Sequence, residues 1–472
     1  MGSISVIVPA YNSGEQLTTC LQAVRDSTQA PLEIIVVDDS STDDTRDRAA
    51  AFGAKVLRTG GRRGPGFGRN LGSVEATGDI LFFIDADVCV RNDTIERITR
   101  DFESDADLDA VMGSYDRMPG CWNFLSQYRN LMHTFVHQHG EKQASTFWSG
   151  CGAIRREIFA VHGGFDESRS RPAIEDIELG YRLILNGRKI MLDHELQVTH
   201  LKSWSFWGMI KTDIFDRGIP WTELILSRRF MPNDLNLRFS QRISVVLVFL
   251  LAALTGLLIA KDGAHMLIPV LTIVFLMLAG WWTEIRNLVR PRRALVLLSC
   301  FVVLLAYQAY LHRMTALVAI LLLSPAFVLL MRPSYYRNRT PTWSYVLSSL
   351  YIVASLCIAM LALPVRPLLL LWFALLAVLA LLNAQFYLFL VEERRIVFMM
   401  AAIPLHFLHH FYNGFSFLIG IGRHGWSTFY RPTRMPVKPS VQRVAVDQTG
   451  LEESSLSQPA FIFPDSHTGE DR

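Results

Sequence analysis

Long apolar runs fill the second half of the chain, and they limit its fold more than any other feature. After Arg242 one run follows another, and each is close to the ~20 residues that a helix needs to cross a bilayer core. A buried core helix of a soluble protein would not recur so often in succession. Half of all residues are hydrophobic (50%) and only 19% are charged, which excludes a wholly soluble or disordered chain. The pattern predicts an α-helical transmembrane domain whose apolar runs are 243–260, 264–282, 294–311, 314–331, 343–363, 368–391 and 396–421.

The charges of the connecting segments predict the orientation of these helices. Segments 283–293, 332–341 and 392–395 are basic, whereas the segments between the other runs are shorter and poorer in charge. The positive-inside rule therefore places the basic segments and the N-terminal domain in the cytoplasm of a multi-pass protein of the cell or inner membrane. The sequence does not open with a basic segment followed by an apolar stretch, so we expect no signal peptide.

The run 396–421 differs from the others because it contains His406, His409 and His410. Polar side chains at membrane depth usually have a partner. The run either crosses the membrane a seventh time, which would place the basic tail outside, or is re-entrant or interfacial, so six or seven helices remain open. The last residues, 448–472, are rich in Ser and acidic residues without periodicity, which predicts disorder.

Net charge and cysteine usage exclude two classes of protein. A net charge of +3 is too small to indicate a nucleic-acid partner. The six cysteines are scattered with no CxxC pair, which excludes a disulfide framework and a zinc ribbon and fits a reducing compartment.

The N-terminal half has the pattern of an α/β domain. Short apolar runs at 5–9, 32–37 and 80–84 are typical of strands, and helical patterns such as 15–26 lie between them. This alternation predicts a Rossmann-like, mostly parallel sheet with helices on both faces. Ligands of such sheets bind at the carboxyl ends of the strands, so the residues that follow each strand are the first candidates for a site.

Acidic pairs follow two of these strands. Asp38 and Asp39 either accept hydrogen bonds from a base or ribose, or lead into a cap of the next helix. Asp85 and Asp87 are one residue apart, a spacing that suits a hard divalent cation such as Mg²⁺ or Mn²⁺ but that also occurs in polar turns.

Two further segments carry candidate side chains. Arg69 precedes the second acidic pair by one helix length, and its planar fork matches phosphate oxygens. The Gly-rich loop 60–68 before it is either a mobile flap or a solvated loop. Glu175 and Asp176 open a predicted helix that ends at Asn186 before a glycine. Acids at a helix start are either structural or supply a general base.

Short motifs occur in a fixed order along the first 200 residues. They are VIVPAYN at 6–12, VDDSS at 37–41, GRNLG at 68–72, DAD at 85–87, GGFDE at 163–167 and ED at 175–176. Each motif alone is common, but the ordered set resembles family 2 glycosyltransferases over residues 4–200. The resemblance implies a GT-A catalytic domain at 1–200, interfacial helices at 201–241, a transmembrane domain of six or seven helices at 242–425 and a disordered tail at 426–472.

The resemblance also implies functions for individual residues. The Glu175-Asp176 pair would supply the catalytic base, at Asp176. Asp87 would bind Mg²⁺ or Mn²⁺, and His200 would complete that metal site unless it is a solvent-facing residue at a strand end. The residues implied in binding the nucleotide-sugar donor are Pro9, Tyr11, Asp38, Asp39, Arg69, Asp85, Gly150 and Gly152.

Taken together, these features predict an inverting, metal-dependent glycosyltransferase that moves one sugar from a nucleotide sugar to a membrane lipid or lipid-linked acceptor. Polysaccharide synthases of this family carry a QxxRW motif, and segment 217–221 (RGIPW) lacks the Arg before Trp221. A processive synthase and a catalytically silent nucleotide-sugar-binding membrane protein are the alternatives.

Three aromatic or histidine-rich segments complete the expectations. Segment 200–230 mixes aromatic residues with cations and is either an interfacial helix at the headgroup level or a core helix. His133 and His137 lie on one helix face, either as zinc ligands or as residues of an interfacial or core helix. The histidines of run 396–421 would line an acceptor groove.

Overall fold

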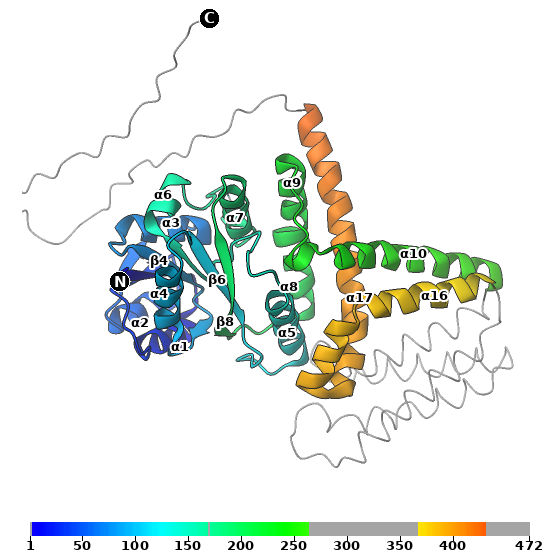
Figure 1. The fold of residues 1–472 in the computed structure, drawn as a ribbon, viewed down its shortest axis with the longest axis horizontal. Helices are drawn as coiled ribbons and strands as arrows, with labels where there is room; N and C mark the ends of the chain where they lie inside the picture. Colours follow the sequence, from blue (N-terminus) through cyan, green and yellow to red (C-terminus); the bar gives the residue numbers. More distant parts are fainter. Residues whose placement is uncertain (1, 169, 264–366, 431–472) are drawn as a thin grey trace, which may run out of the picture. The chain divides into compact units, whose positions relative to one another are not determined.

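The computed structural model describes residues 2–168, 170–263 and 367–430 (Figure 1). The apolar runs expected at 264–282, 294–311, 314–331 and 343–363 lie outside the described residues, as do the basic segments between them and the tail from residue 431.

An eight-stranded sheet forms the centre of the N-terminal domain. Its strands are β1 (Ile4–Ala10), β2 (Glu33–Asp38), β3 (Lys55–Arg58), β4 (Ile80–Ile84), β5 (Val88–Val90), β6 (Ala110–Tyr115), β7 (Cys151–Arg155) and β8 (Ile190–His200), in the order β3-β2-β1-β4-β7-β6-β8-β5. The three strands expected from the sequence correspond to β1, β2 and β4. Strands β3, β2, β1 and β4 are parallel, as expected, but β7 runs antiparallel to both of its neighbours and β5 runs antiparallel to β8. The sheet is therefore mixed rather than mostly parallel, because alternation along the chain does not determine the direction of each strand.

Helices cover both faces of this sheet. One face packs against α1 (Gly14–Arg25), α2 (Thr45–Ala51) and α4 (Thr94–Ser104), and the other against α3 (Pro65–Glu75), α6 (Arg156–Val161) and α7 (Glu175–Leu185). Side chains of β1 alternate between the two layers: Val6 and Val8 belong to the first core cluster and Ile7 to the second. This alternation is the period of two expected for strands that are covered on both sides.

Helix α3 lies unusually close to the sheet because of its glycines. A Cβ atom on Gly72 would lie 2.6 Å from Cγ2 of Ile7, and one on Gly68 would lie 3.4 Å from Cβ of Pro9. This close approach places Arg69, which lies between the two glycines, against the carboxyl end of the sheet.

Segment 201–241 leaves the sheet as a series of short helices. These are α8 (Phe206–Lys211), a π-helical turn η1 (Thr212–Gly218), α9 (Ile219–Arg228) and a 3₁₀ turn η2 (Leu235–Leu237). Trp204 is buried, whereas Trp207 is 70% exposed and Phe215 is 59% exposed. One set of these aromatic residues therefore lies in the core and another at the surface, and the position of the segment at the headgroup level stays a prediction.

Three helices follow in the described part of the second half: α10 (Phe239–Asp262), α16 (Pro367–Leu382) and α17 (Ala384–Tyr430). Within the described residues one helix, at Phe239–Lys261, is long and apolar enough to cross a bilayer. Helices α16 and α17 meet that criterion only as a pair, and they are bent by 61°. The expected single run 368–391 is therefore divided at Asn383, whose side-chain amide donates to Oγ of Ser244 on α10 at 2.9 Å.

Helix α17 packs against the N-terminal domain. A buried cluster joins aromatic and aliphatic residues of α5 (Phe124–Gln138) to Trp204 and to residues of α17. The backbone of α17 is interrupted at Arg395, where φ is +74°. Beside this interruption Glu393 pairs with Arg117, and Nε of Arg394 donates to Gln127 at 2.7 Å. The start of α17 is thus fixed to the N-terminal domain by both apolar and charged contacts.

Candidate active site

Sheet pairing brings the second aspartate of the DAD motif beside His200. Val88 of β5 lies opposite His200 of β8, and the amide of Leu201 donates to the carbonyl of Asp87 at 2.8 Å. Nε2 of His200 consequently lies 3.5 Å from Oδ2 of Asp87. Asp87 and His200, which are 113 positions apart in sequence, therefore present a carboxylate oxygen and an imidazole nitrogen to the same point.

The environment of Asp87 favours its ionised form. Burial acts to raise the pKa of this carboxyl, but the hydrogen bond and charge of His200 and the charge of Lys202 outweigh burial and lower the pKa. An anionic carboxylate beside an imidazole is a donor set that suits Mn²⁺ or Mg²⁺. In the described part of the chain no three His, Cys, Asp or Glu side chains form a complete metal site. The pair thus fits an ion that takes its other ligands from diphosphate oxygens and water.

Arg69 links the DAD motif to the ED motif. Its guanidinium donates to Oδ1 of Asp85 at 2.7 Å and to Oε1 of Glu175 at 2.9 Å, and its side chain is only 4% exposed. Burial acts to lower the pKa of Arg69, but the carboxylates of Asp85 and Glu175 raise it, so the guanidinium stays charged. This differs from the expected contact with a diphosphate, because the fork of Arg69 is already used by two carboxylates.

Glu175 is held on both of its carboxylate oxygens. Oε1 accepts from Arg69, and Oε2 accepts from the amide of Ala173 at 3.0 Å. The side chain is buried. Of the two acids in the ED motif, Glu175 therefore positions the start of α7 and Arg69.

Asp176 has the environment of a general base. Oδ2 accepts from the backbone amide of Ser149 at 3.1 Å and from its hydroxyl at 3.2 Å, and Oδ1 accepts from the amide of Ile177 at 2.8 Å. Burial and the negative charge of Glu175 raise the pKa of Asp176 from 3.8 to about 6, although Arg69 and the two amides act to lower it. A carboxylate with this pKa is ionised at neutral pH and is basic enough to accept a proton from a hydroxyl.

The contact between Asp176 and Ser149 follows from strand register. Ile84 of β4 lies opposite Cys151 of antiparallel β7, so the segment before β7 reaches the carboxyl end of β4 beside Asp85. Gly150 lies in this segment and Gly152 lies in β7, and a Cβ atom on either would come within 2.6 Å of atoms of Trp148 or Phe147. Ser149 was not singled out from the sequence; its position before the two glycines was the available signal.

The expected base and ribose site lies at the ends of β1 and β2, and its acids bind the local backbone. Oδ1 of Asp38 accepts from the amide of Ser41 at 3.0 Å. Asp39 accepts from the amides of Arg63 and Gly64 at 2.8 and 2.9 Å, which holds the Gly-rich loop 60–68 against the sheet. This loop is therefore tied to the sheet at Asp39.

Tyr11 is the exposed aromatic side chain of that region. Its ring is 36% exposed, and the guanidinium carbon of Arg62 lies 3.5 Å from the ring centroid. Pro9 lies in β1 opposite Val37 of β2. No hydrogen bond or ion pair among the described residues joins the side chains of Tyr11, Asp38 and Asp39 to those of Asp85 and Asp87. The predicted site residues therefore form two groups, one around Arg69 and one around the Gly-rich loop.

A stack of rings lies next to His200, and the sequence analysis did not predict it. Tyr115 of β6 stacks on His200 with ring centroids 4.3 Å apart, and it also contacts His133 at 4.3 Å and Trp148 at 4.9 Å. His133 and His137 stack on each other at 4.0 Å, and Nδ1 of His137 lies 3.0 Å from the carbonyl of Gly113. Burial lowers the pKa of His137 to about 4. These contacts favour the core-helix interpretation of the two histidines over the zinc site.

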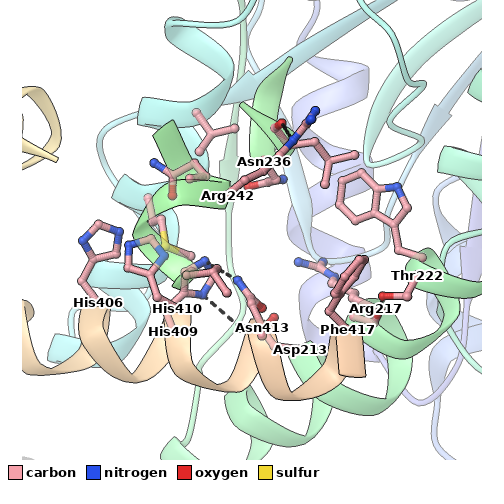
Figure 2. A pocket seen from close by; sticks show the side chains of 18 of the residues that line it. Asp213, Arg217, Thr222, Asn236, Arg242, His406, His409, His410, Asn413 and Phe417 are labelled. Carbon is pink, nitrogen blue, oxygen red and sulfur yellow. Dashed lines mark hydrogen bonds and ion pairs between the residues drawn. The ribbon is translucent and has the colours of Figure 1, made fainter. Parts of the chain in front are cut away.

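His133 also lines a cavity of about 400 Å³. Figure 2 shows this cavity from close by. It is lined by residues of α5, η1, α9, η2, α10 and α17, among them Arg217, Trp221 and Arg242. His406, His409 and His410, expected to line a groove, all line this cavity.

Comparison with known proteins identifies the N-terminal domain. Residues 5–163 match the family model described as Glycosyl transferase family 2. Glycosyltransferase GlyG of Streptococcus pneumoniae serotype 4 is 33% identical over 117 residues, which cover 24% of this chain and 38% of GlyG. The O-antigen chain rhamnosyltransferase WbaN of Salmonella anatum is 26% identical over 245 residues, 47% of this chain and 75% of WbaN. The N-terminal domain is therefore a family 2 glycosyltransferase domain.

The chain is also similar to solved structures at low sequence identity. Mannosyltransferase PcManGT from Pyrobaculum calidifontis, in complex with GDP-Man and Mn²⁺, has a TM-score of 0.38 and 16% identity, with coverage of 85% of this chain and 86% of that one. S. aureus TarS 1-349 has a TM-score of 0.37 and 19% identity, with coverage of 48% and 65%.

Proposed function

We propose that this chain, built on a family 2 glycosyltransferase domain, is an inverting, metal-dependent glycosyltransferase that moves one sugar from a nucleotide sugar to a membrane lipid or lipid-linked acceptor. One observation carries the proposal: just after the carboxyl end of β4, Asp87 lies beside His200, and Asp85 is joined through the buried Arg69 to Glu175, the residue before Asp176. A cation ligand set and a base with a raised pKa are the two elements that displacement of a nucleoside diphosphate requires.

The residues of this site would divide the reaction between them. Asp176 takes the proton from the acceptor hydroxyl, and the oxygen attacks the anomeric carbon on the face opposite the diphosphate. Because a single displacement reverses the configuration at that carbon, the product is inverted. Ser149 and the start of α7 hold the carboxylate of Asp176 in a fixed orientation for this step.

Asp87 and His200 would hold Mg²⁺ or Mn²⁺, which when bound supplies positive charge to the leaving diphosphate. Arg69 does not contact the diphosphate in this scheme. It holds Asp85 beside the donor and fixes Glu175 next to the base. The face of Tyr11 and the loop held by Asp39 would receive the base and ribose, with Arg62 as the cation nearest that face.

We infer the class of acceptor from the surface of helices α10, α16 and α17 in the second half of the chain. Exposed side chains of α10, α16 and α17 include many large apolar residues, among them Val246 at 58%, Leu381 at 74% and Leu388 at 62%. Apolar surface of this extent marks a membrane or protein contact. Glu393 and Arg394 contact the N-terminal domain, which supports a position of that domain and of the basic segment 392–395 on the same side of the membrane. The positive-inside rule makes this the cytoplasmic side.

Membranes from cells that produce the full chain, incubated with a panel of labelled nucleotide sugars and Mn²⁺, test the proposal. We expect label in a glycolipid that carries one added sugar. A long polymer as product would instead establish the processive synthase, and the complete absence of transfer, with donor still bound, would establish a silent nucleotide-sugar-binding protein. Configuration of the new glycosidic bond, determined by NMR, tests inversion separately.

A further inference from the structure

The cavity shown in Figure 2 carries an excess of positive charge. Of the described residues that line it, Asp213 is the one carboxylate, and Asp213 is already paired with Arg129 and accepts from the hydroxyl of Tyr412. Arg242 and Arg217 remain without a carboxylate in this lining. The guanidinium of Arg242 donates to backbone carbonyls, including that of Pro232 at 2.6 Å. The cavity therefore has the electrostatics of an anion site.

Arg217 is a cation of this lining that forms no ion pair with the described residues, although its charge acts on Asp213 from beyond ion-pair distance. Within the described part of the chain it has neither a hydrogen bond nor an ion pair, and its side chain is exposed at the cavity. It lies in the π-helical turn η1, an irregular form of helix that is frequent at functional sites. His410 adds a second unpartnered group: it is only 2% exposed, and its buried Nε2 has no hydrogen-bond partner in the described residues. A buried nitrogen without a partner is costly unless a ligand completes it.

The same cavity also reaches the apolar surface. Val246 of α10 and Phe417 of α17 both line it, and they are 58% and 36% exposed. One part of the cavity is thus cationic and another is apolar and open beside α10 and α17. A ligand that satisfies both parts must be an amphipathic anion.

Aromatic and histidine rings connect the lining of the cavity to the proposed catalytic groups. His133 lines the cavity, and its ring lies 4.3 Å from Tyr115 and 4.6 Å from Trp148. Tyr115 stacks on His200, and Ser149, which follows Trp148, binds Asp176. The cavity therefore borders the rings that contact the metal candidate and precede the residue that binds the proposed base.

We propose that this cavity binds the acceptor, a phosphate-bearing lipid, with its phosphate at Arg217 and its hydrocarbon chain leaving between Val246 and Phe417. This inference rests on the proposed function. The phosphate serves as a handle, and the nucleophile is a hydroxyl group on the head of the same lipid. In the transfer, the hydroxyl oxygen forms a bond to the anomeric carbon, its proton passes to Asp176, and the bond to the diphosphate breaks with the electron pair leaving on the nucleoside diphosphate.

The test is equilibrium binding to the full chain in an uncharged detergent, measured by isothermal titration calorimetry. The probes are dioctanoyl phosphatidic acid, dioctanoylglycerol with the same tails but no phosphate, and inorganic phosphate with no tails. We expect phosphatidic acid to bind at least about tenfold more tightly than either control, since hydrogen bonds to charged groups contribute the energy of one to two decades in affinity. If dioctanoylglycerol bound as tightly as phosphatidic acid, the proposed recognition of the phosphate by Arg217 would be refuted. If inorganic phosphate bound as tightly, the proposed contribution of the hydrocarbon chains would be refuted.

Variants assign the binding to the cavity. Arg217→Ala should lower the affinity for phosphatidic acid by at least about tenfold. Arg217→Lys should keep most of this affinity because it keeps the positive charge. Lys211→Ala is the matched control: it removes one exposed cation from the same segment but outside the cavity lining, and it should change affinity by less than about twofold. Unchanged affinity in Arg217→Ala, with an unchanged melting temperature, refutes the site.

Failure of this inference and failure of the proposed function give different results. Binding requires no donor, so Arg217-dependent binding without any sugar transfer would refute the enzyme and keep the site. Sugar transfer to a lipid with the same KM in wild type and Arg217→Ala would keep the enzyme and refute the site.

Discussion

Replacement of Asp176 by Asn separates the chemistry of the base from its place in the fold. Asn has the same shape and can still accept hydrogen bonds from Ser149, but it cannot take a proton. Loss of a general base costs about 10² to 10⁴ in rate, or roughly 3–5 kcal/mol of transition-state stabilisation at about 1.4 kcal/mol per decade. We therefore expect transfer by Asp176→Asn to fall by at least about 100-fold in kcat, with donor affinity nearly unchanged.

The pKa of Asp176 predicts the pH dependence of the wild-type enzyme. With a pKa of about 6, the carboxylate is the base form in roughly nine molecules of ten at pH 7 and in one of ten at pH 5. Activity should fall about tenfold between these two values. If the pKa stood at the ordinary 3.8, the base form would still predominate at pH 5 and activity would hardly change.

Stability supplies an independent readout of the same carboxyl. Because the folded-state pKa is raised, ionisation of Asp176 opposes folding: the penalty is absent below the unfolded pKa near 3.8 and complete above about 6. A shift of about two units corresponds to an upper estimate of about 3 kcal/mol. Asp176→Asn removes this penalty but also loses the hydrogen bond that Oδ1 accepts from the amide of Ile177. The stability of the inactive variant relative to wild type should therefore be higher at pH 7.5 than at pH 4.

The assay is single-turnover transfer from the labelled donor identified by the panel, from pH 5 to pH 8, together with thermal unfolding of the purified full chain. Full transfer to a hydroxyl acceptor by a folded Asp176→Asn protein would refute the base assignment. A flat profile from pH 7 to pH 5 would refute the raised pKa, and a stability difference between variant and wild type that is the same at pH 4 and pH 7.5 would contradict the burial argument.

Three further predictions follow from the same contacts. Ser149→Ala removes a hydrogen bond to the ionised form of Asp176, so the acidic limb of the pH–rate profile should move to higher pH; an unmoved limb would assign that limb to another group. Chelation of divalent metal should abolish sugar transfer, and added Mn²⁺ should restore it. Asp87→Asn should raise the Mn²⁺ concentration for half-maximal activity by at least about tenfold. Sugar transfer that persists with a chelator would exclude a metal requirement. Arg129→Met leaves Asp213 buried without its paired cation and should lower the free energy of unfolding, measured by denaturant titration, by about 3–5 kcal/mol. The further change Asp213→Leu should restore most of that free energy. Equal losses in the single and double variants would show that the two residues are not coupled.

Local patterns were sufficient for much of the fold. Short apolar runs located β1, β2 and β4, and the Gly187 stop predicted the end of α7 within a residue or two. Such signals depend on side chains near one another in sequence, and a strand or helix end forms wherever they occur. The direction of β7 and the break at Asn383 were not predictable in this way, because both depend on partners elsewhere: β4 and β6 for the strand, and Ser244 for the amide.

The candidate site shows the same division. The sequence supplied the acids themselves, since Asp85, Asp87, Glu175 and Asp176 stand where strand and helix ends expose polar residues. It did not indicate that Arg69 would be enclosed between two of them.

The sequence by itself determined the chemical inventory of this protein: a set of carboxylates at element ends, a histidine that closes the last strand, and an apolar second half. The tertiary structure decided which of these groups meet. The register of β5 on β8 places His200 against Asp87, and the register of β7 on β4 brings Ser149 to Asp176. The physical reason is that side-chain identity is a local property, whereas contact between residues far apart in sequence depends on strand order and register, which the whole packed sheet determines together.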